Sequence, residues 1–219
     1  MIRPLRALPV TLATSIYAMS CGLAQAQTDL GIADDDIWCY DRAGDPAGDP
    51  VLRIWGNDGD DLNPTGYPGE GGVGRSFYSY AFLQWDLAGL PDGYRWRGAT
   101  LILTAEDASS YDPATDEVRV RGLTAPFDES TWSFGRGSKP IYGDTNYLLA
   151  DDSGYTGAGS EIRVEIPANL PEAVLQKWRT DRKIYLCVTS PIDFDNDGKF
   201  LRIASRDNLL FDGPRLILH

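Results

Sequence analysis

The chain has 219 residues and a formal net charge of −12. This surplus of negative charge repels nucleic acid and anionic membrane surfaces, so we expect neither as a partner. The sequence contains one histidine, His219, and three cysteines. These are too few to favour a zinc site or a histidine-dependent catalytic triad. The composition therefore points away from nucleic-acid-binding proteins and zinc enzymes.

Residues 1–26 are typical of a secretory signal peptide. Two arginines precede an apolar run over residues 7–19, and Ala24-Gln25-Ala26 has the small residues of a cleavage site. The apolar run is too short to span a bilayer, so we expect no membrane insertion. An alternative is lipidation at Cys21. Cleavage after Ala26 would release residues 27–219 as one secreted domain, extracellular or periplasmic, which is long enough to bury a single core.

The segment after the signal alternates between polar loops and short apolar runs. Residues 28–36 are polar and acidic and are expected to form an arm, followed by a first strand over Ile37–Tyr40. A second strand is predicted over Val51–Trp55, where Val51, Arg53 and Trp55 alternate with Leu52 and Ile54. Glycines, prolines and acidic residues over 56–74 indicate a long loop.

The central unit consists of a strand, a corner and a second strand. Both side-chain parities over Phe77–Trp85 are apolar or aromatic, which predicts a strand covered on both faces. Gly89-Leu90-Pro91-Asp92-Gly93 supplies the corner, and the aliphatic run Ala99–Thr104 predicts the next strand.

The rest of the chain favours more strands and one helix. Over Glu117–Leu123, Val118 and Val120 are expected on one face and Arg119 and Arg121 on a half-solvated face. The run Asn169–Arg179 predicts a short helix capped by Asn169, with Val174, Leu175 and Trp178 on one stripe. Further strands are expected at Ile162–Ile166, Ile184–Val188, Phe200–Ala204 and Pro214–Leu218. The pattern predicts an all-β fold, an antiparallel jelly-roll-like β-sandwich with one short helix.

The two cysteines beyond the signal, Cys39 and Cys187, are an even number in a compartment that permits disulfides. We therefore expect a Cys39–Cys187 bridge between an early and a late strand. The alternative is two buried free thiols.

Several segments together resemble DNRLRE-type domains, secreted β-sandwiches grouped with carbohydrate-binding modules. The main one is Leu83-Gln84-Trp85-Asp86-Leu87 with Gly89-Leu90-Pro91-Asp92-Gly93 and the strand that follows. The others, in the order of that family, are Asp49 to Ile54, Phe127-Asp128-Glu129-Ser130-Thr131-Trp132, Ala204-Ser205-Arg206-Asp207 and Pro214-Arg215-Leu216-Ile217. The resemblance implies a β-sandwich that binds carbohydrate.

A calcium turn is predicted at Asp193-Phe194-Asp195-Asn196-Asp197-Gly198. Carboxylates at positions one, three and five and glycine at six match the oxygen-ligand spacing of an EF-hand loop. Position twelve is Ala204 instead of glutamate, so an EF-hand is excluded and a looser site with Asp193, Asp195 and Asp197 remains. The alternative is a plain hairpin turn. The acidic residues Asp58, Asp60 and Asp61 are a second, weaker candidate.

Sugar recognition needs aromatic faces and planar polar side chains, and the sequence has both. The candidate ligand-binding residues are Tyr80, Trp96, Arg119, Arg121 and Tyr142. The arginines, together with Arg95, Arg97 and Arg163, are suited to carboxylated sugars, although they could also be ordinary partners of nearby acids.

No motif is specific to a reaction. Paired carboxylates such as Asp128 with Glu129 would suit glycoside hydrolysis, and Tyr80 with Arg119 would suit polysaccharide β-elimination. The first hypothesis is a secreted, non-catalytic polysaccharide-binding protein, with Ca²⁺ as a structural ion. The alternatives are a small secreted lyase or glycoside hydrolase, and a structural or adhesive component of the cell surface.

Overall fold

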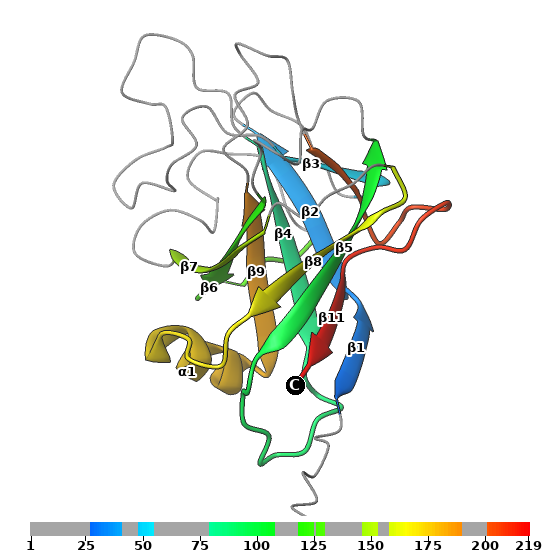
Figure 1. The fold of residues 1–219 in the computed structure, drawn as a ribbon. Helices are drawn as coiled ribbons and strands as arrows, with labels where there is room; N and C mark the ends of the chain where they lie inside the picture. The colour runs from blue at the N-terminus through cyan, green and yellow to red at the C-terminus, as the bar shows by residue number, and fades with distance from the viewer. Residues whose placement is uncertain are drawn as a thin grey trace, which may run out of the picture.

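The computed structural model describes residues 27–40, 48–54, 79–107, 118–124, 126–129, 146–152, 158–189 and 201–219. The predicted signal segment, the two candidate calcium loops and Tyr142 lie outside these residues. In the described part, two antiparallel sheets pack face to face and a short helix lies at one end (Figure 1). The predicted all-β sandwich with one short helix is confirmed.

The first sheet has the strand order β1-β11-β5-β10-β3, and β8 pairs with the other edge of β5. Its strands are β1 (Thr28–Ile32), β3 (Val51–Ile54), β5 (Ala99–Asp107), β8 (Glu161–Ile166), β10 (Leu201–Ala204) and β11 (Arg215–Leu218). Strands β10 and β11 lie end to end beside β5, because Ile203 pairs with Ala105 and Arg215 pairs with Ile102. Residues 205–214 therefore form an excursion between β10 and β11, which begins and ends at the same edge of β5.

The second sheet has the order β2-β4-β9-β6-β7. Its strands are β2 (Asp35–Tyr40), β4 (Ser79–Asp86), β6 (Val118–Leu123), β7 (Asn146–Asp152) and β9 (Lys183–Thr189). Residues from both sheets, including Phe82, Trp85, Leu101 and Leu103, form one buried core. All side chains of β4 from Tyr80 to Trp85 are buried, as its apolar character on both parities predicts.

Two strands differ from the sequence-based prediction. Residues 28–32 form β1 instead of an arm, because their backbone pairs with β11 while most of their side chains stay exposed. A polar sequence can form such an edge strand without any apolar alternation. No strand was predicted at β7, which pairs with β6.

The helix α1 (Glu172–Asp181) begins after Pro171, not after Asn169 as predicted. No side chain caps it; instead the Pro171 carbonyl accepts the N–H groups of Val174 and Leu175. Val174 and Trp178 are buried, and the indole Nε1 of Trp178 donates to the Leu123 carbonyl at 2.9 Å. These contacts fix the helix against the end of the second sheet. In the described residues no helix has the length and apolarity needed to cross a membrane.

The expected disulfide between Cys39 and Cys187 is not present. Cys39 lies on β2 and Cys187 on β9, and β4 runs between these strands. Strands two positions apart are separated by roughly 9.5 Å, whereas bridged cysteines need Cα atoms within about 7 Å. Cys187 is buried and takes part in no disulfide. The sequence could not reveal this, because it does not give the order of strands within a sheet.

Candidate functional site

The connection between β4 and β5, residues 87–98, lies at the same end of the sandwich as α1 and the C-terminus (Figure 1). Arg182, which follows α1 in a left-handed conformation, holds the start of this connection. Its guanidinium donates to the carbonyls of Leu87 at 2.9 Å and Leu90 at 2.7 Å. Its own carbonyl accepts the Leu87 N–H at 2.8 Å. The helix and the connection are therefore fixed relative to each other.

Trp96 packs between this connection and the helix. Its ring centroid lies 5.3 Å from that of Trp178 in an edge-to-face arrangement. Its indole Nε1 donates to the Pro167 carbonyl at 2.9 Å. The Trp96 side chain remains partly exposed. Because its N–H is already bonded, the accessible part of this ring offers an apolar surface.

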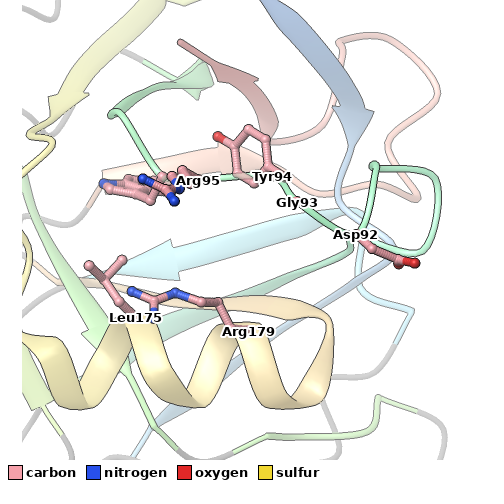
Figure 2. Close-up of a pocket in the computed structure, with 7 residues that line it drawn as sticks. Asp92, Gly93, Tyr94, Arg95, Leu175 and Arg179 are labelled. Atoms are coloured by element: carbon pink, nitrogen blue, oxygen red, sulfur yellow. The ribbon is translucent and has the colours of Figure 1, made fainter.

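A hollow of about 600 Å³ lies between the connection and α1. In Figure 2, Tyr94 and Arg95 lie on one side of it and Leu175 and Arg179 face them from the helix. Arg95 is exposed and has no ion-pair partner among the described residues, whereas Arg179 lies 3.4 Å from Glu172. The hollow, which we call the helix-side groove, combines aromatic surface with two guanidinium groups. It is lined by Asp92, Gly93, Tyr94, Arg95, Trp96, Leu175 and Arg179.

A second hollow of about 610 Å³ lies on the other side of the same connection. Tyr94 and Arg95 line both hollows, so they form the ridge between them. Arg97 and His219 line only the second hollow, and the His219 Nε2 lies 2.9 Å from the Thr100 hydroxyl. The two hollows therefore adjoin along this ridge.

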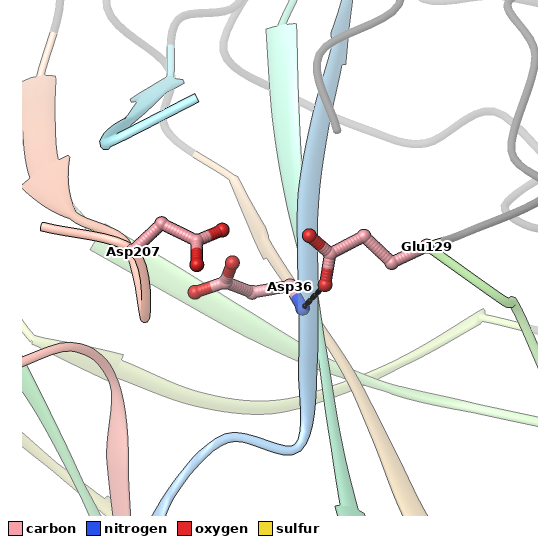
Figure 3. A group of neighbouring side chains, drawn as sticks. All are labelled: Asp36, Glu129 and Asp207. Carbon is pink, nitrogen blue, oxygen red and sulfur yellow. Dashed lines mark hydrogen bonds between the residues drawn. The ribbon is translucent and has the colours of Figure 1, made fainter. Parts of the chain in front are cut away.

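A cluster of three carboxylates, Asp36, Glu129 and Asp207, lies at a different place, where β2 passes the excursion 205–214 (Figure 3). One oxygen of each carboxylate lies within 4.8 Å of the others. The Asp36 carboxylate is 2% exposed and accepts the Arg206 N–H at 2.6 Å. The two oxygens of Glu129 accept the N–H groups of Asp36 and Gly48, both at 3.3 Å.

The cluster perturbs the titration of its most buried member. Burial raises the pKa of Asp36 to about 7, and the negative charges of Glu129 and Asp207 act in the same direction. The N–H and guanidinium of Arg206 oppose this rise, since both favour the charged carboxylate. The Arg206 guanidinium lies 3.5 Å from Glu129 and supplies part of the neutralising charge. In chemical terms, three carboxylate oxygens at this spacing are ligands of the kind that Ca²⁺ prefers.

The structure places the predicted sugar-binding residues in three different environments. Trp96 lines the helix-side groove. Tyr80 is 3% exposed on the central strand β4, so the expectation that its ring is available for stacking is wrong. Arg121 is 7% exposed on β6, which lies inside its sheet between β9 and β7, so the expectation that it lies on a solvated face is wrong. Arg119 is partly exposed on β6, away from this groove, and Tyr142 lies outside the described residues.

Several site residues were not predicted from the sequence as binding residues. Leu175 and Arg179 reach the groove because α1 packs beside a connection that lies about eighty residues earlier in the chain. Their four-residue spacing on one helical face was the available signal. Asp36 and Asp207 were also missed, since they meet Glu129 only through the fold. The Asp193, Asp195 and Asp197 calcium turn lies outside the described residues and stays a prediction.

The comparisons with known proteins add little to this description. No family model matches the chain, and no curated protein matches it. Among solved structures, it is similar to the K1 cleaved adhesin domain of Lys-gingipain from Porphyromonas gingivalis W83, at 13% sequence identity and a TM-score of 0.27. The match covers 89% of this chain and 96% of that one. A likeness this slight supports no conclusion about function.

Proposed function

We propose that this chain is a secreted, non-catalytic polysaccharide-binding protein and that the helix-side groove is its binding site. The observation that carries the proposal is the groove itself. There a partly exposed indole ring, Trp96, lies beside the guanidinium groups of Arg95 and Arg179 in a hollow of about 600 Å³. This volume is in the range of ordinary small-molecule sites.

The groove suits sugar chemistry because it separates two kinds of contact. The apolar C–H face of a pyranose can stack on Trp96, whose N–H is occupied by Pro167 and does not compete. The planar guanidinium of Arg95 can donate to ring hydroxyls or to a sugar carboxylate. Arg95 has no competing ion pair in the described part of the chain, so a ligand need not break one.

Two expectations from the sequence support the proposal. The signal-like residues 1–26 predict secretion, and the resemblance to DNRLRE-type domains predicts carbohydrate binding. Two of the segments that carry the resemblance meet in space, since Arg206 lies 3.5 Å from Glu129. This ion pair gives both segments a structural role, because it holds them together in the fold. Ca²⁺ at Asp193, Asp195 and Asp197 remains part of the proposal as a structural ion.

The enzyme hypothesis has less support. Tyr80 is buried, so it is not available to act with Arg119 in β-elimination. Of the predicted pair, Asp128 is exposed, but both Glu129 oxygens already accept N–H groups, from Asp36 and Gly48. A carboxylate pair in glycoside hydrolysis must reach the scissile bond. The structural or adhesive hypothesis needs no sugar site, and the experiment below separates it from binding.

The test is a panel of insoluble and immobilised polysaccharides: β-glucan, xylan, mannan, polygalacturonate and a sulfated galactan. Residues 27–219 are measured for retention and for release of reducing or unsaturated ends. We expect retention on at least one polysaccharide without new ends. Release of ends that Glu129→Gln abolishes would replace binding by catalysis. Failure to bind any member would favour the structural hypothesis.

A further inference from the structure

The excursion 205–214 presents two adjacent leucines to solvent at its tip. Leu209 is 97% exposed and Leu210 is 83% exposed. The tip is held in one shape by Asn208, whose Oδ1 accepts the Leu210 N–H at 2.8 Å and whose Nδ2 donates to the Pro50 carbonyl at 2.9 Å. An apolar pair on a fixed turn loses little conformational freedom on binding, which favours a docking role. We call Leu209 and Leu210 the leucine tip.

Asp212 gives the neighbourhood of the leucine tip a negative charge. Its side chain is exposed and has no ion-pair partner in the described part of the chain. Insertion of the tip into a bilayer would carry this carboxylate to the surface of the lipids, in a chain whose formal net charge is already −12. Anionic lipids repel such a chain. The tip therefore fits a partner with apolar surface beside a positive charge.

The second hollow of this same chain has both features. Leu90 and Pro91 give it apolar surface, and Arg95 and Arg97 also line it. Both arginines are exposed, and neither has an ion-pair partner among the described residues. The other described arginines all form ion pairs or take part in further interactions. The arginines that the described structure leaves unpaired thus lie together in one hollow of about 610 Å³.

The leucine tip and the second hollow lie at opposite ends of β11. The excursion 205–214 precedes this strand, and His219, which lines the hollow, follows it. A strand of four residues spans about 13 Å. In Figure 1 the excursion projects from the side of the sandwich, away from the connection 87–98. A tip that is fixed in this position cannot enter the hollow of its own chain, so a contact between the two surfaces joins two copies.

We propose that the leucine tip of one copy docks in the second hollow of another copy, with Asp212 beside Arg97. The contact is head-to-tail, so it repeats along a chain of copies unless the rotation closes a ring. A two-residue tip covers less than the roughly 800 Å² per partner of a stable complex, so the dissociation constant lies between micromolar and millimolar. The inference goes beyond the proposed function, since Arg97 does not line the helix-side groove.

Sedimentation velocity of residues 27–219, from about 10 μM to about 1 mM, tests the association. For a double variant, Leu209→Ser with Leu210→Ser, we expect self-association at least about tenfold weaker than that of the wild type. Ile32→Ser is the matched control, because Ile32 is 45% exposed on β1, outside the tip. This control should associate like the wild type.

A charge exchange tests which surfaces meet. Arg97→Glu and Asp212→Lys should each weaken self-association, because like charges then face each other. In an equal mixture, the Asp212→Lys tip meets the Arg97→Glu hollow and the unchanged tip meets the unchanged hollow. We therefore expect the mixture to associate like the wild type.

Three results would overturn the inference: a wild type that stays monomeric at about 1 mM, self-association that the leucine variant does not weaken, or a mixture that stays as weak as its components. Cosedimentation with phosphatidylcholine vesicles that the leucine variant loses would also overturn it, because the tip would then bind membrane. None of these results bears on retention by the polysaccharide panel, so the proposed function is tested separately.

Discussion

The backbone N–H of Arg206 donates a 2.6 Å hydrogen bond to the buried carboxylate of Asp36, across 170 residues of sequence. This bond joins β2 to the excursion that interrupts the line of β10 and β11. Burial of Asp36 beside Glu129 and Asp207 makes the contact depend on its protonation state. The Arg206 N–H favours the charged carboxylate, but burial outweighs it, so the folded state favours a neutral Asp36.

The first prediction concerns pH. The pKa of Asp36 is raised from 3.8 to about 7 in the folded state, so its stabilising contribution is complete below about pH 4 and is lost as the pH rises through 7. Asp36→Asn keeps an oxygen for Arg206 and removes the charge. We expect the variant to be more stable than the wild type by about 4 kcal/mol at pH 8 and by about 2 kcal/mol at pH 5.

Urea unfolding at the two pH values measures this difference. Comparing the variant with the wild type cancels the opposite pH dependence of Asp29 and Asp181, whose pKa values are lowered by partners that include Arg215 and Lys177. A stability difference that is the same at pH 5 and pH 8 would show that Asp36 titrates normally.

The second prediction concerns calcium. A cation that binds only the folded state stabilises it by mass action, so chelation should lower the melting temperature of the wild type. We expect Asp195→Ala to reduce that shift and Asp207→Asn to leave it unchanged. The reverse pattern would place the cation at the Asp36, Glu129 and Asp207 cluster. A wild-type melt that chelation does not alter would rule out a stabilising Ca²⁺ at either place.

The third prediction concerns the thiols. Because β4 separates the strands of Cys39 and Cys187, denatured but unreduced protein should alkylate at both cysteines. In the folded protein the buried Cys187 should react far more slowly than after denaturation. Mass analysis of the alkylated peptides checks both statements. Finding a Cys39–Cys187 cross-linked peptide instead would contradict the strand order of the second sheet.

The fourth prediction concerns Gly213, which lets the excursion 205–214 return close to its own start. A Cβ added at Gly213 would lie 2.8 Å from the Arg206 Cα and 2.9 Å from the Arg206 nitrogen. Both are backbone atoms, so Gly213→Ala should cost about 1–3 kcal/mol in the free energy of unfolding. Gly89→Ala is the matched control, because nothing lies within 4 Å of its added Cβ. Equal stabilities of the two variants in urea would argue against this packing.

The sequence predicted those elements whose pattern is local. β4 and β8 were predictable because burial on both parities and strict alternation are visible in single segments. β1 was not, because its polar residues form a strand only through pairing with β11. Arg121 was predicted on a solvated face but is buried, because β6 lies inside its sheet between β9 and β7. Register and strand order depend on distant segments, and a single sequence does not encode them as a pattern.

The candidate site also has some residues that the sequence could predict and others that only the fold brings together. Trp96 was predicted from residue type and its place near a corner, and it lines the groove. Its partners Leu175 and Arg179 come from a helix whose docking position depends on the burial of Trp178. Asp36, Glu129 and Asp207 come from three segments that only the fold brings together. Single residues could therefore be named from sequence, but their groupings could not.

The central claim is that Trp96 forms the sugar-binding surface, and the most direct measurement is the affinity of two Trp96 variants for a retained polysaccharide. Trp96→Phe keeps an aromatic face against Trp178 but loses the bond to Pro167, whereas Trp96→Ala removes the face. We expect a tenfold to hundredfold loss, about 1–3 kcal/mol, for Trp96→Ala and a much smaller loss for Trp96→Phe. If folded Trp96→Ala binds the polysaccharide as tightly as the wild type, the helix-side groove is not the binding site.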